Sequence, residues 1–378
     1  MAAISQFSFP TTIHFGAGAR ALVAPHLRER GYARALVVTD RGLAGLPVLE
    51  EFRARLAGLD THVHAGVAGN PTRAQVRDAV AAYRAHGADC VIGFGGGAAL
   101  DVAKATALMA VHAGDVLEYA WDHPNARPID RELPYLVALP TTSGTGSEVG
   151  RSAVISEDAT HVKRIIFSPA LLARAVFADP ELTLGLPAGI TAATGMDALT
   201  HNIESYLSPA WHPPCDGIAL EGARIAAHAL ERAVATPNDI AARADMMMAS
   251  MMGAIAFQKD LGAVHSCAHA LGTVVDMHHG LANGIMIDHV MRFNLGAADA
   301  KMAELARVCG AGASAESLVA WIAALKARIG IPARLAARGV DARHVPRLVE
   351  IAVADTCHRT NCRACTAADF ERIFREAL

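Results

Sequence analysis

Gly93–Ala98 reads GFGGGA, and this turn joins an apolar run at Asp89–Phe94 to a helix-forming stretch at Ala98–Ala113. The same order, a short apolar run followed by an amphipathic stretch, recurs on both sides of it. The other apolar runs are Arg34–Asp40, Thr61–Ala65 and Tyr135–Leu139, and the other amphipathic stretches are Leu46–Leu56 and Thr72–His86. β-Branched strands that alternate with helices predict a parallel sheet covered by helices on both faces.

Two domains are expected, because single hydrophobic cores stop growing near roughly 250–300 residues and the chain has 378. Residues 153–178 look extended, as a hairpin or as edge strands. The Pro- and Gly-rich segment Asp179–Gly189 (DPELTLGLPAG) then marks a boundary, and helix-forming residues dominate after it. We predict an α/β domain at residues 1–187 and an all-α domain at residues 188–378, with roughly seven to nine helices of ordinary length.

The composition excludes several classes of protein. The chain is 52% hydrophobic and 19% charged, with a net charge of −3 and no block of like charge, which argues against nucleic-acid binding or a polybasic membrane anchor. Met1–Phe15 lacks the order of a signal peptide, and the Met-rich stretch Met246–Phe257 is shorter than the ~18–20 residues that cross a bilayer, so it is interpreted as a buried helix. Seven irregularly spaced cysteines favour a reducing, cytoplasmic location.

The glycine-rich turn predicts a dinucleotide site. GFGGGA fits G-x-G-x-x-A between a strand and a helix, where backbone N–H groups can approach a pyrophosphate. Asp40, which ends an earlier apolar run, is placed to accept hydrogen bonds from a ribose diol and would repel a 2′-phosphate, which favours NAD over NADP. The alternative is that Asp40 only begins a turn before Gly42. A second loop, Pro140–Glu148 (PTTSGTGSE), offers hydroxyl and backbone donors to an anion or ribose.

Histidines and one aspartate in the second half have the spacing of metal ligands. Asp197 and His201 stand four residues apart, His265 and His269 repeat this spacing, and His279 follows. Residues at i and i+4 share one helix face. Buried imidazole and carboxylate groups are costly unless they are paired or bind a metal, so the pattern predicts a divalent metal site of one carboxylate and three imidazoles. The spacing alone does not decide between His265 and His269.

Cys357, Cys362 and Cys365 could suggest a second metal or redox site near the C-terminus. A single C-x-x-C without a second pair is more often a pair of inert thiols, and we favour that interpretation.

These motifs together resemble the iron-containing (group III) alcohol dehydrogenase family over nearly the whole chain. The resemblance is carried by His14–Gly18 (HFGAG), Gly95–Lys104 (GGGAALDVAK), Pro140–Val149 (PTTSGTGSEV), Asp179–Thr183 (DPELT), Thr191–Glu204 (TAATGMDALTHNIE) and His265–Gly284. It implies a nucleotide-binding domain followed by a helical domain, an architecture shared with dehydroquinate synthase. Departures from the family pattern are Ala98 for a common Ser, Ser152 for Asn, Asn202 for Ala, and Cys362 and Cys365 for prolines.

The resemblance also implies roles for individual residues. The metal ligands are expected at Asp197, His201, His265 and His279, whereas His269 is expected to be a catalytic, non-ligand histidine that relays a proton near the nicotinamide. Contacts with NAD are expected at Asp40, Asn70, Gly95, Gly96, Gly97, Asp101, Thr141, Thr142, Thr145, Ser147 and Lys163. The expected metal is Fe²⁺, with Zn²⁺ as the alternative because it generally binds such a site more tightly.

The expected function is a metal-dependent, NAD(H)-linked oxidoreductase that interconverts a small primary alcohol and its aldehyde, in a homodimer or larger homo-oligomer. The 4-hydroxybutyrate dehydrogenase branch of the family is resembled by Pro213–Asp216 with Ile218–Leu220 and by the ending near His358–Asn361. The carboxylate of such a substrate would need a cation, for which Arg151 and Lys163 are candidates. The alternatives are a maleylacetate reductase, a sugar-phosphate cyclase related to dehydroquinate synthase, and a non-enzymatic metal-storage or sensory module.

Overall fold

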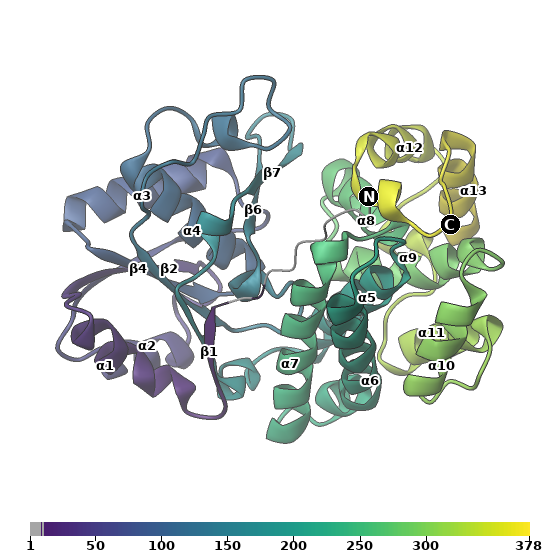
Figure 1. Cartoon of the computed structure of the whole chain (residues 1–378), viewed down its shortest axis with the longest axis horizontal. Helices are drawn as coiled ribbons and strands as arrows, with labels where there is room; N and C mark the ends of the chain where they lie inside the picture. Colours follow the sequence, from purple (N-terminus) through teal and green to yellow (C-terminus); the bar gives the residue numbers. More distant parts are fainter. Residues whose placement is uncertain (1–8, 10) are drawn as a thin grey trace, which may run out of the picture. The chain divides into compact units, whose positions relative to one another are not determined.

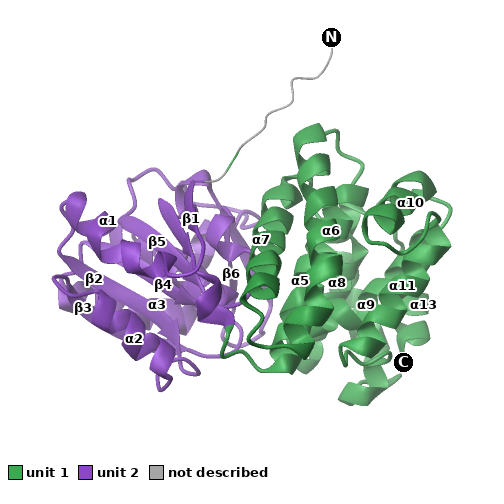
Figure 2. Cartoon of the chain, turned by 90° about the horizontal axis from the view of Figure 1, so that it is seen from below, with its two compact units in different colours: residues 1–9, 143–145, 184–378 green, residues 10–142, 146–183 purple. Residues whose placement is uncertain are grey.

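The structure, a computed structural model, describes residue 9 and residues 11–378. The described chain consists of two compact units (Figure 2). The sheet unit comprises residues 11–142 and 146–183, and the helical unit comprises residues 9, 143–145 and 184–378. The chain passes between the units at Thr183/Leu184, close to the expected boundary at 187/188, which itself stays a prediction.

The sheet unit contains six parallel strands in the order β1-β8-β5-β4-β2-β3. Their bounds are β1 Thr12–Phe15, β2 Arg34–Asp40, β3 Asp60–Val67, β4 Cys90–Gly95, β5 Tyr135–Pro140 and β8 Ala175–Ala178. Figure 1 labels β1, β2 and β4 of this sheet. The four predicted strands and the parallel sheet are confirmed. The expectation of a hairpin or edge strands across residues 153–178 is wrong in part, because β8 pairs with both β1 and β5 in the interior of the sheet.

Helices cover both faces of this sheet, as the near-continuous apolar strands predict. On one face Ile92 and Phe94 of β4 pack in a core with Leu49 and Phe52 of α2. On the other face Gly93 approaches α4 so closely that an added Cβ would lie 3.0 Å from Leu100. The helices of the unit are α1 Val23–Glu29, α2 Pro47–Arg55, α3 Arg73–His86 and α4 Gly97–Val111, with short 3-10 helices η1 Ala19–Leu22, η2 Val116–Tyr119, η3 Ser147–Val149, η4 Pro169–Leu171 and η5 Pro180–Thr183.

An antiparallel hairpin follows the Pro140–Glu148 loop. It consists of β6 (Ser152–Ser156) and β7 (Lys163–Phe167), which pair from Ser152↔Phe167 to Ser156↔Lys163. The expected hairpin is confirmed for this part of residues 153–178.

The described residues 184–378 form nine α-helices around one large apolar core, which agrees with the predicted helical domain. Their bounds are α5 Ala188–Leu207, α6 Pro213–Ala235, α7 Ile240–Ala256, α8 Ala263–Val275, α9 His279–Asn294, α10 Asp299–Val308, α11 Ala315–Arg328, α12 Val345–Ala354 and α13 Ala367–Ala377. Three 3-10 helices join them: η6 Phe257–Lys259, η7 Leu335–Arg338 and η8 Cys357–Thr360.

The Met-rich stretch lies in α7, where Met246, Met247 and Met251 are almost completely buried. The continuous helical segment Ile240–Lys259 is longer than the sequence pattern indicated. By length and composition alone this 20-residue helix could cross a membrane, because an 18-residue window of it has a mean hydropathy of 1.3, but 56% of that window is buried inside the protein. Burial of this extent is the behaviour of a core helix, and the prediction of a buried Met-rich helix is confirmed.

Candidate metal centre and nucleotide loops

Four side chains from three helices of the helical unit converge on one point. Asp197 and His201 project from α5, His265 from the first turn of α8, and His279 is the first residue of α9. One ligand atom of each residue lies within 4.8 Å of the others. From Asp197 Oδ1 the Nε2 atoms are 3.9 Å away in His201, 3.9 Å in His265 and 3.4 Å in His279. The structure therefore brings together the four residues expected as ligands.

The local sequence explains how the three helices come so close. Asp197 and His201 share a face because they are four residues apart on α5. Gly280, beside His279, permits the start of α9 to touch α5, since an added Cβ would lie 2.4 Å from the backbone oxygen of Ala193. Any other residue there would push His279 away from the cluster.

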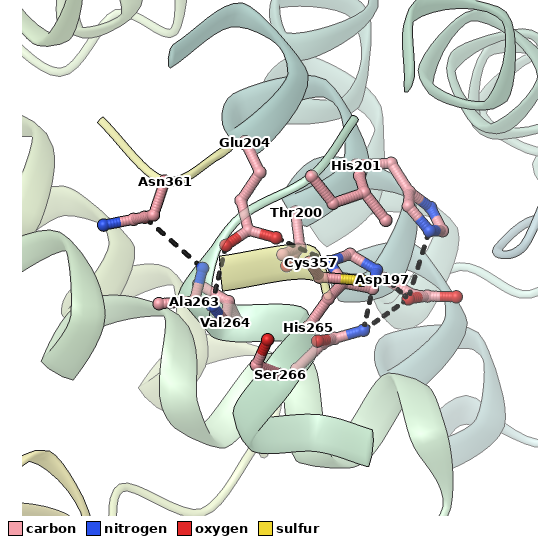
Figure 3. A network of polar contacts seen from close by, with 12 residues as sticks. Asp197, Thr200, His201, Glu204, Ala263, Val264, His265, Ser266, Cys357 and Asn361 are labelled. Atoms are coloured by element: carbon pink, nitrogen blue, oxygen red, sulfur yellow. Dashed lines mark hydrogen bonds and ion pairs between the residues drawn. The ribbon is translucent and has the colours of Figure 1, made fainter. Parts of the chain in front are cut away.

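Glu204 orients one of the histidines (Figure 3). Its Oε2 lies 2.6 Å from Nδ1 of His265, and its Oε1 accepts a 2.7 Å hydrogen bond from the backbone N–H of Val264. An ionised carboxylate can only accept, so Nδ1 of His265 carries the proton and Nε2 presents its lone pair toward Asp197. Burial opposes protonation of His265, but the partnership with Glu204 raises its pKa above the ordinary value.

The chemistry of this donor set fits a divalent metal ion. Burial lowers the pKa of His201 to about 4, so its imidazole is neutral and able to bind a metal. Asp197 is 2% exposed, and its ion pairs within the described residues are all with histidines. The side-chain amide of Asn283 donates to Asp197 Oδ1 at 2.7 Å, which supplies only partial positive charge. One buried carboxylate and three imidazoles without a full counter-charge suit Fe²⁺ or Zn²⁺.

His269 takes a different partner from the four converging residues. Its Nδ1 lies 2.7 Å from Oδ2 of Asp355, while Oδ1 of Asp355 accepts from the Ser266 hydroxyl at 2.7 Å and from the backbone N–H of Cys357 at 2.9 Å. Burial would raise the pKa of Asp355, but His269 and these donors hold it well below its ordinary value. The His269 ring stacks on that of His279 at 5.3 Å between centroids, so it borders the metal centre.

One of the thiols, that of Cys357, lies near this pair. Cys357 can approach His269 and Asp355 closely enough to form a second group of potential ligands. Both oxygens of Asp355 already accept hydrogen bonds, however, and burial raises the pKa of Cys357 well above its ordinary value. Burial also raises the pKa of Cys362 to about 11 and that of Cys365 to about 12. Protonated thiols bind metals poorly, which supports the interpretation as inert thiols.

The nucleotide loops meet at the carboxyl edge of the sheet. Gly95 of β4 pairs with Pro140 of β5, and the N–H of Thr141 donates to the Gly95 carbonyl at 3.0 Å. Gly95 has a φ of +154°, and an added Cβ would lie 2.6 Å from Ala99 and 3.3 Å from the carboxylate of Asp40. Asp40 also accepts from the N–H of Leu43 at 3.0 Å. The structure therefore places Asp40 beside the glycine-rich turn, where open α/β sheets bind their ligands.

The remaining residues expected to contact NAD lie on and after these loops. Gly96 is the N-cap of α4, Gly97 begins that helix, and Thr142 is 3.3 Å from the position of a Gly96 Cβ. Asp101 accepts from Ser147 at 2.6 Å and from the N–H of Val154 at 3.0 Å. These contacts hold the second loop and β6 in place. Asn70 follows β3, Lys163 begins β7, and Thr145 belongs to the helical unit. Their contacts with a nucleotide stay predictions.

Sequence reasoning missed three polar partners of the site: Glu204, Asn283 and Asp355. Glu204 lies seven residues after Asp197, on the same face of α5, and Asn283 lies four residues after His279, so helical spacing could have indicated both. Asp355 is 86 residues from His269 in the chain, and no local pattern connects them.

Comparisons with known proteins agree with this geometry. Residues 10–180 match the family model described as iron-containing alcohol dehydrogenase, and residues 191–378 match the C-terminal model of the Fe-containing alcohol dehydrogenase family. The chain is 41% identical over 378 residues to a 4-hydroxybutyrate dehydrogenase of Cupriavidus necator, which covers 97% of this chain and 98% of the relative. It is 37% identical over 385 residues to a 1,3-propanediol dehydrogenase of Citrobacter freundii, with 99% and 98% covered.

The fold agrees as well. A crystal structure of a 1,3-propanediol oxidoreductase superimposes with a TM-score of 0.94 at 36% identity and covers 99% of this chain and 100% of that chain. The two family models together extend over nearly the whole sequence, and so does each of the two relatives. The matched residues include all four converging ligands and the glycine-rich turn. The chain belongs to the iron-containing alcohol dehydrogenase family.

Proposed function

We propose that this enzyme interconverts a small primary alcohol and its aldehyde with NAD(H) and Fe²⁺, and that its substrate is a diol or an ω-hydroxy acid such as 4-hydroxybutyrate. The observation that carries the proposal is the convergence of Asp197, His201, His265 and His279 within 4.8 Å in the buried part of the helical unit. Family membership supports NAD and iron as the cofactors. The relative named 4-hydroxybutyrate dehydrogenase supports the ω-hydroxy acid.

The chemistry divides between the cofactors and the chain. When bound, a divalent ion supplies Lewis acidity to the substrate oxygen, and NAD exchanges a hydride with the substrate carbon. Asp197 and the three histidines would hold the ion, and Glu204 keeps His265 in the tautomer that ligation requires. Asp40 and the turn at Gly95–Gly97 would hold the ribose and the pyrophosphate.

His269 is proposed to carry the alcohol proton outward. Asp355 fixes the proton of His269 on Nδ1, so Nε2 is left to accept a proton, directly or through water. The resulting imidazolium would be stabilised by the ionised Asp355. This arrangement separates the ligand histidines from the proton-accepting histidine, although His265 and His269 lie on the same helix.

Recognition of a substrate carboxylate is proposed for Arg151 or Lys163. The Arg151 guanidinium lies over the Phe167 ring, 5.3 Å from its centroid, and Phe167 is half exposed. Lys163 interacts electrostatically with the buried Asp101, which favours a role on the cofactor side. Arg151 is therefore the stronger candidate, and its replacement by Met should raise KM for 4-hydroxybutyrate without raising KM for butanol.

We also propose that the enzyme is cytoplasmic and that it forms a homo-oligomer. The seven free thiols are compatible with a reducing compartment. Strand β1 is at the edge of the sheet, where its unpaired backbone groups could pair with a second copy.

The test is NAD⁺ reduction over short alcohols, diols and ω-hydroxy acids, with iron and zinc supplied in separate anaerobic preparations. We expect the highest kcat/KM for 4-hydroxybutyrate or 1,3-propanediol in the iron preparation. Equal turnover after complete removal of metal, together with NADH-dependent reduction of maleylacetate, would instead support the maleylacetate reductase alternative.

A further inference from the structure

A buried arginine in the helical unit has no acidic partner among the residues that the structure describes. Arg243 lies in the first turns of α7 and is 2% exposed. Its Nη1 donates to the Thr191 hydroxyl at 2.8 Å and its Nε donates to the Pro237 carbonyl at 3.0 Å. Among the described residues Nη2 has no hydrogen-bond partner. Burial is the only influence that moves the pKa of Arg243, which it lowers, so no carboxylate offsets the charge.

This guanidinium lines a small cavity together with a second unused donor. Ser143, from the PTTSGTGSE loop, is 7% exposed, and its Oγ also has no partner among the described residues. Thr191, Thr194 and the apolar side chain of Met246 form other parts of the wall. About 10 Å³ of this space is open to the centre of a water-sized sphere, which is room for one water molecule or one small ion.

The charge at this cavity favours an anion over a water molecule. An arginine stays protonated in proteins, and a buried charge without a partner is costly. Thr191 and Arg243 of the wall also come from the first turns of α5 and α7, helices of 20 and 17 residues whose N-terminal ends carry partial positive charge, and Ala233 from the last turn of α6 is the wall residue at a helix C-terminus. Water would satisfy the two donors but leave the positive charge uncompensated. A monovalent anion would accept hydrogen bonds from both donors and would also compensate the charge.

We propose that this cavity binds one small monovalent anion of about the size of chloride, held by Nη2 of Arg243 and Oγ of Ser143. The anion links α7 to the loop that contains Ser143, and it fixes that segment on the helical unit. None of the four residues that converge as metal ligands lines this cavity, and none of the residues expected to contact NAD does.

The direct test is crystallography of the full chain in sodium bromide. We expect a single anomalous peak within hydrogen-bond distance of both Arg243 Nη2 and Ser143 Oγ. A peak of water size without anomalous signal at this position would overturn the proposal.

A solution test uses thermal unfolding at constant ionic strength in sodium chloride and in sodium gluconate, whose anion is too large to enter. At a chloride concentration of ten times its dissociation constant, Tm should exceed that in gluconate by about 3–6 °C. Ser143→Ala should reduce this difference, and Arg243→Met should abolish it. Arg224→Met is the matched control, because Arg224 is an exposed arginine paired with Glu221 and should keep the full difference. If Arg243→Met does not fold, Ser143→Ala alone decides, and an unchanged chloride effect in it refutes the site.

Discussion

Replacing Glu204 by Gln tests whether the metal centre depends on the partner of one ligand. Among the described residues, the hydrogen bonds of the Glu204 carboxylate are with Nδ1 of His265 and with the backbone N–H of Val264. Neither of these atoms is the one that His265 turns toward Asp197. A glutamine retains the size of the side chain and an acceptor for the Val264 N–H. It removes the negative charge that holds the His265 proton on Nδ1, so the variant separates tautomer control from folding.

The size of the effect follows from the burial of this contact. The two side chains are each 1% exposed and 2.6 Å apart, so solvent does not weaken their interaction. Loss of such a partner typically lowers metal affinity by about 10–100-fold, which corresponds to about 1.4–2.7 kcal/mol. Because the pair is fully buried, we expect Glu204→Gln near the upper end of this range.

The assay is competition for Fe²⁺ or Zn²⁺ against a chromophoric chelator, with Glu221→Gln as the control. Glu221 is on neighbouring α6 in an exposed ion pair with Arg224, so its replacement should leave metal affinity unchanged. A dissociation constant for Glu204→Gln within twofold of the wild-type value would refute the proposed role of Glu204.

Three further predictions concern other parts of the enzyme. His269→Ala should lower kcat by about 10²–10⁴-fold, and Asp355→Asn should lower it by about tenfold. In both variants the metal stoichiometry should stay at the wild-type value. Loss of the metal in either variant would place His269 among the ligands. Gly95→Ala should weaken NAD binding by about tenfold through backbone strain and contact with Ala99. Gly45→Ala is the control, because a Cβ there meets no atom within 4 Å and NAD binding should stay unchanged. Equal dissociation constants for the two variants, measured by calorimetry, would contradict the proposed strain at Gly95. In metal-free protein the pKa of His201 is about 4 when folded and about 6.5 when unfolded. The unfolded chain therefore binds more protons, and stability is lost as pH falls from 6.5 toward 4; urea denaturation should show a loss of about 2 kcal/mol from pH 7 to pH 5, and His201→Asn should show a smaller one.

Much of the fold could be predicted because its signals are local. The strands Arg34–Asp40 and Tyr135–Pro140 are continuous apolar runs, and the turn between β4 and α4 carries its glycines in order. Strand β8 has only four residues and gains its place by pairing with β1, which is far away in the sequence. Such pairing depends on the sheet as a whole, so the pattern of residues 175–178 could not reveal it.

The difference between local patterns and contacts of distant segments also explains what could be predicted of the metal centre. Helical spacing indicated Asp197, His201 and the pair of His265 and His269, but it could not assign one of that pair as the ligand. The structure separates them by their partners: Glu204 for His265 and Asp355 for His269. The Asp355 contact joins α8 to the residue that follows α12, and only the folded chain brings them together.

A bound ion at Asp197, His201, His265 and His279 would join α5, α8 and α9 as a cross-link does. Ion binding and the stability of the helical unit are then thermodynamically linked, so a substitution that loosens the packing of these helices weakens ion affinity even when it is remote from the ligands. Conversely, a cell short of iron would hold a fraction of this enzyme that unfolds more readily and is degraded sooner. The amount of enzyme, and not only its turnover, would then follow the supply of the metal.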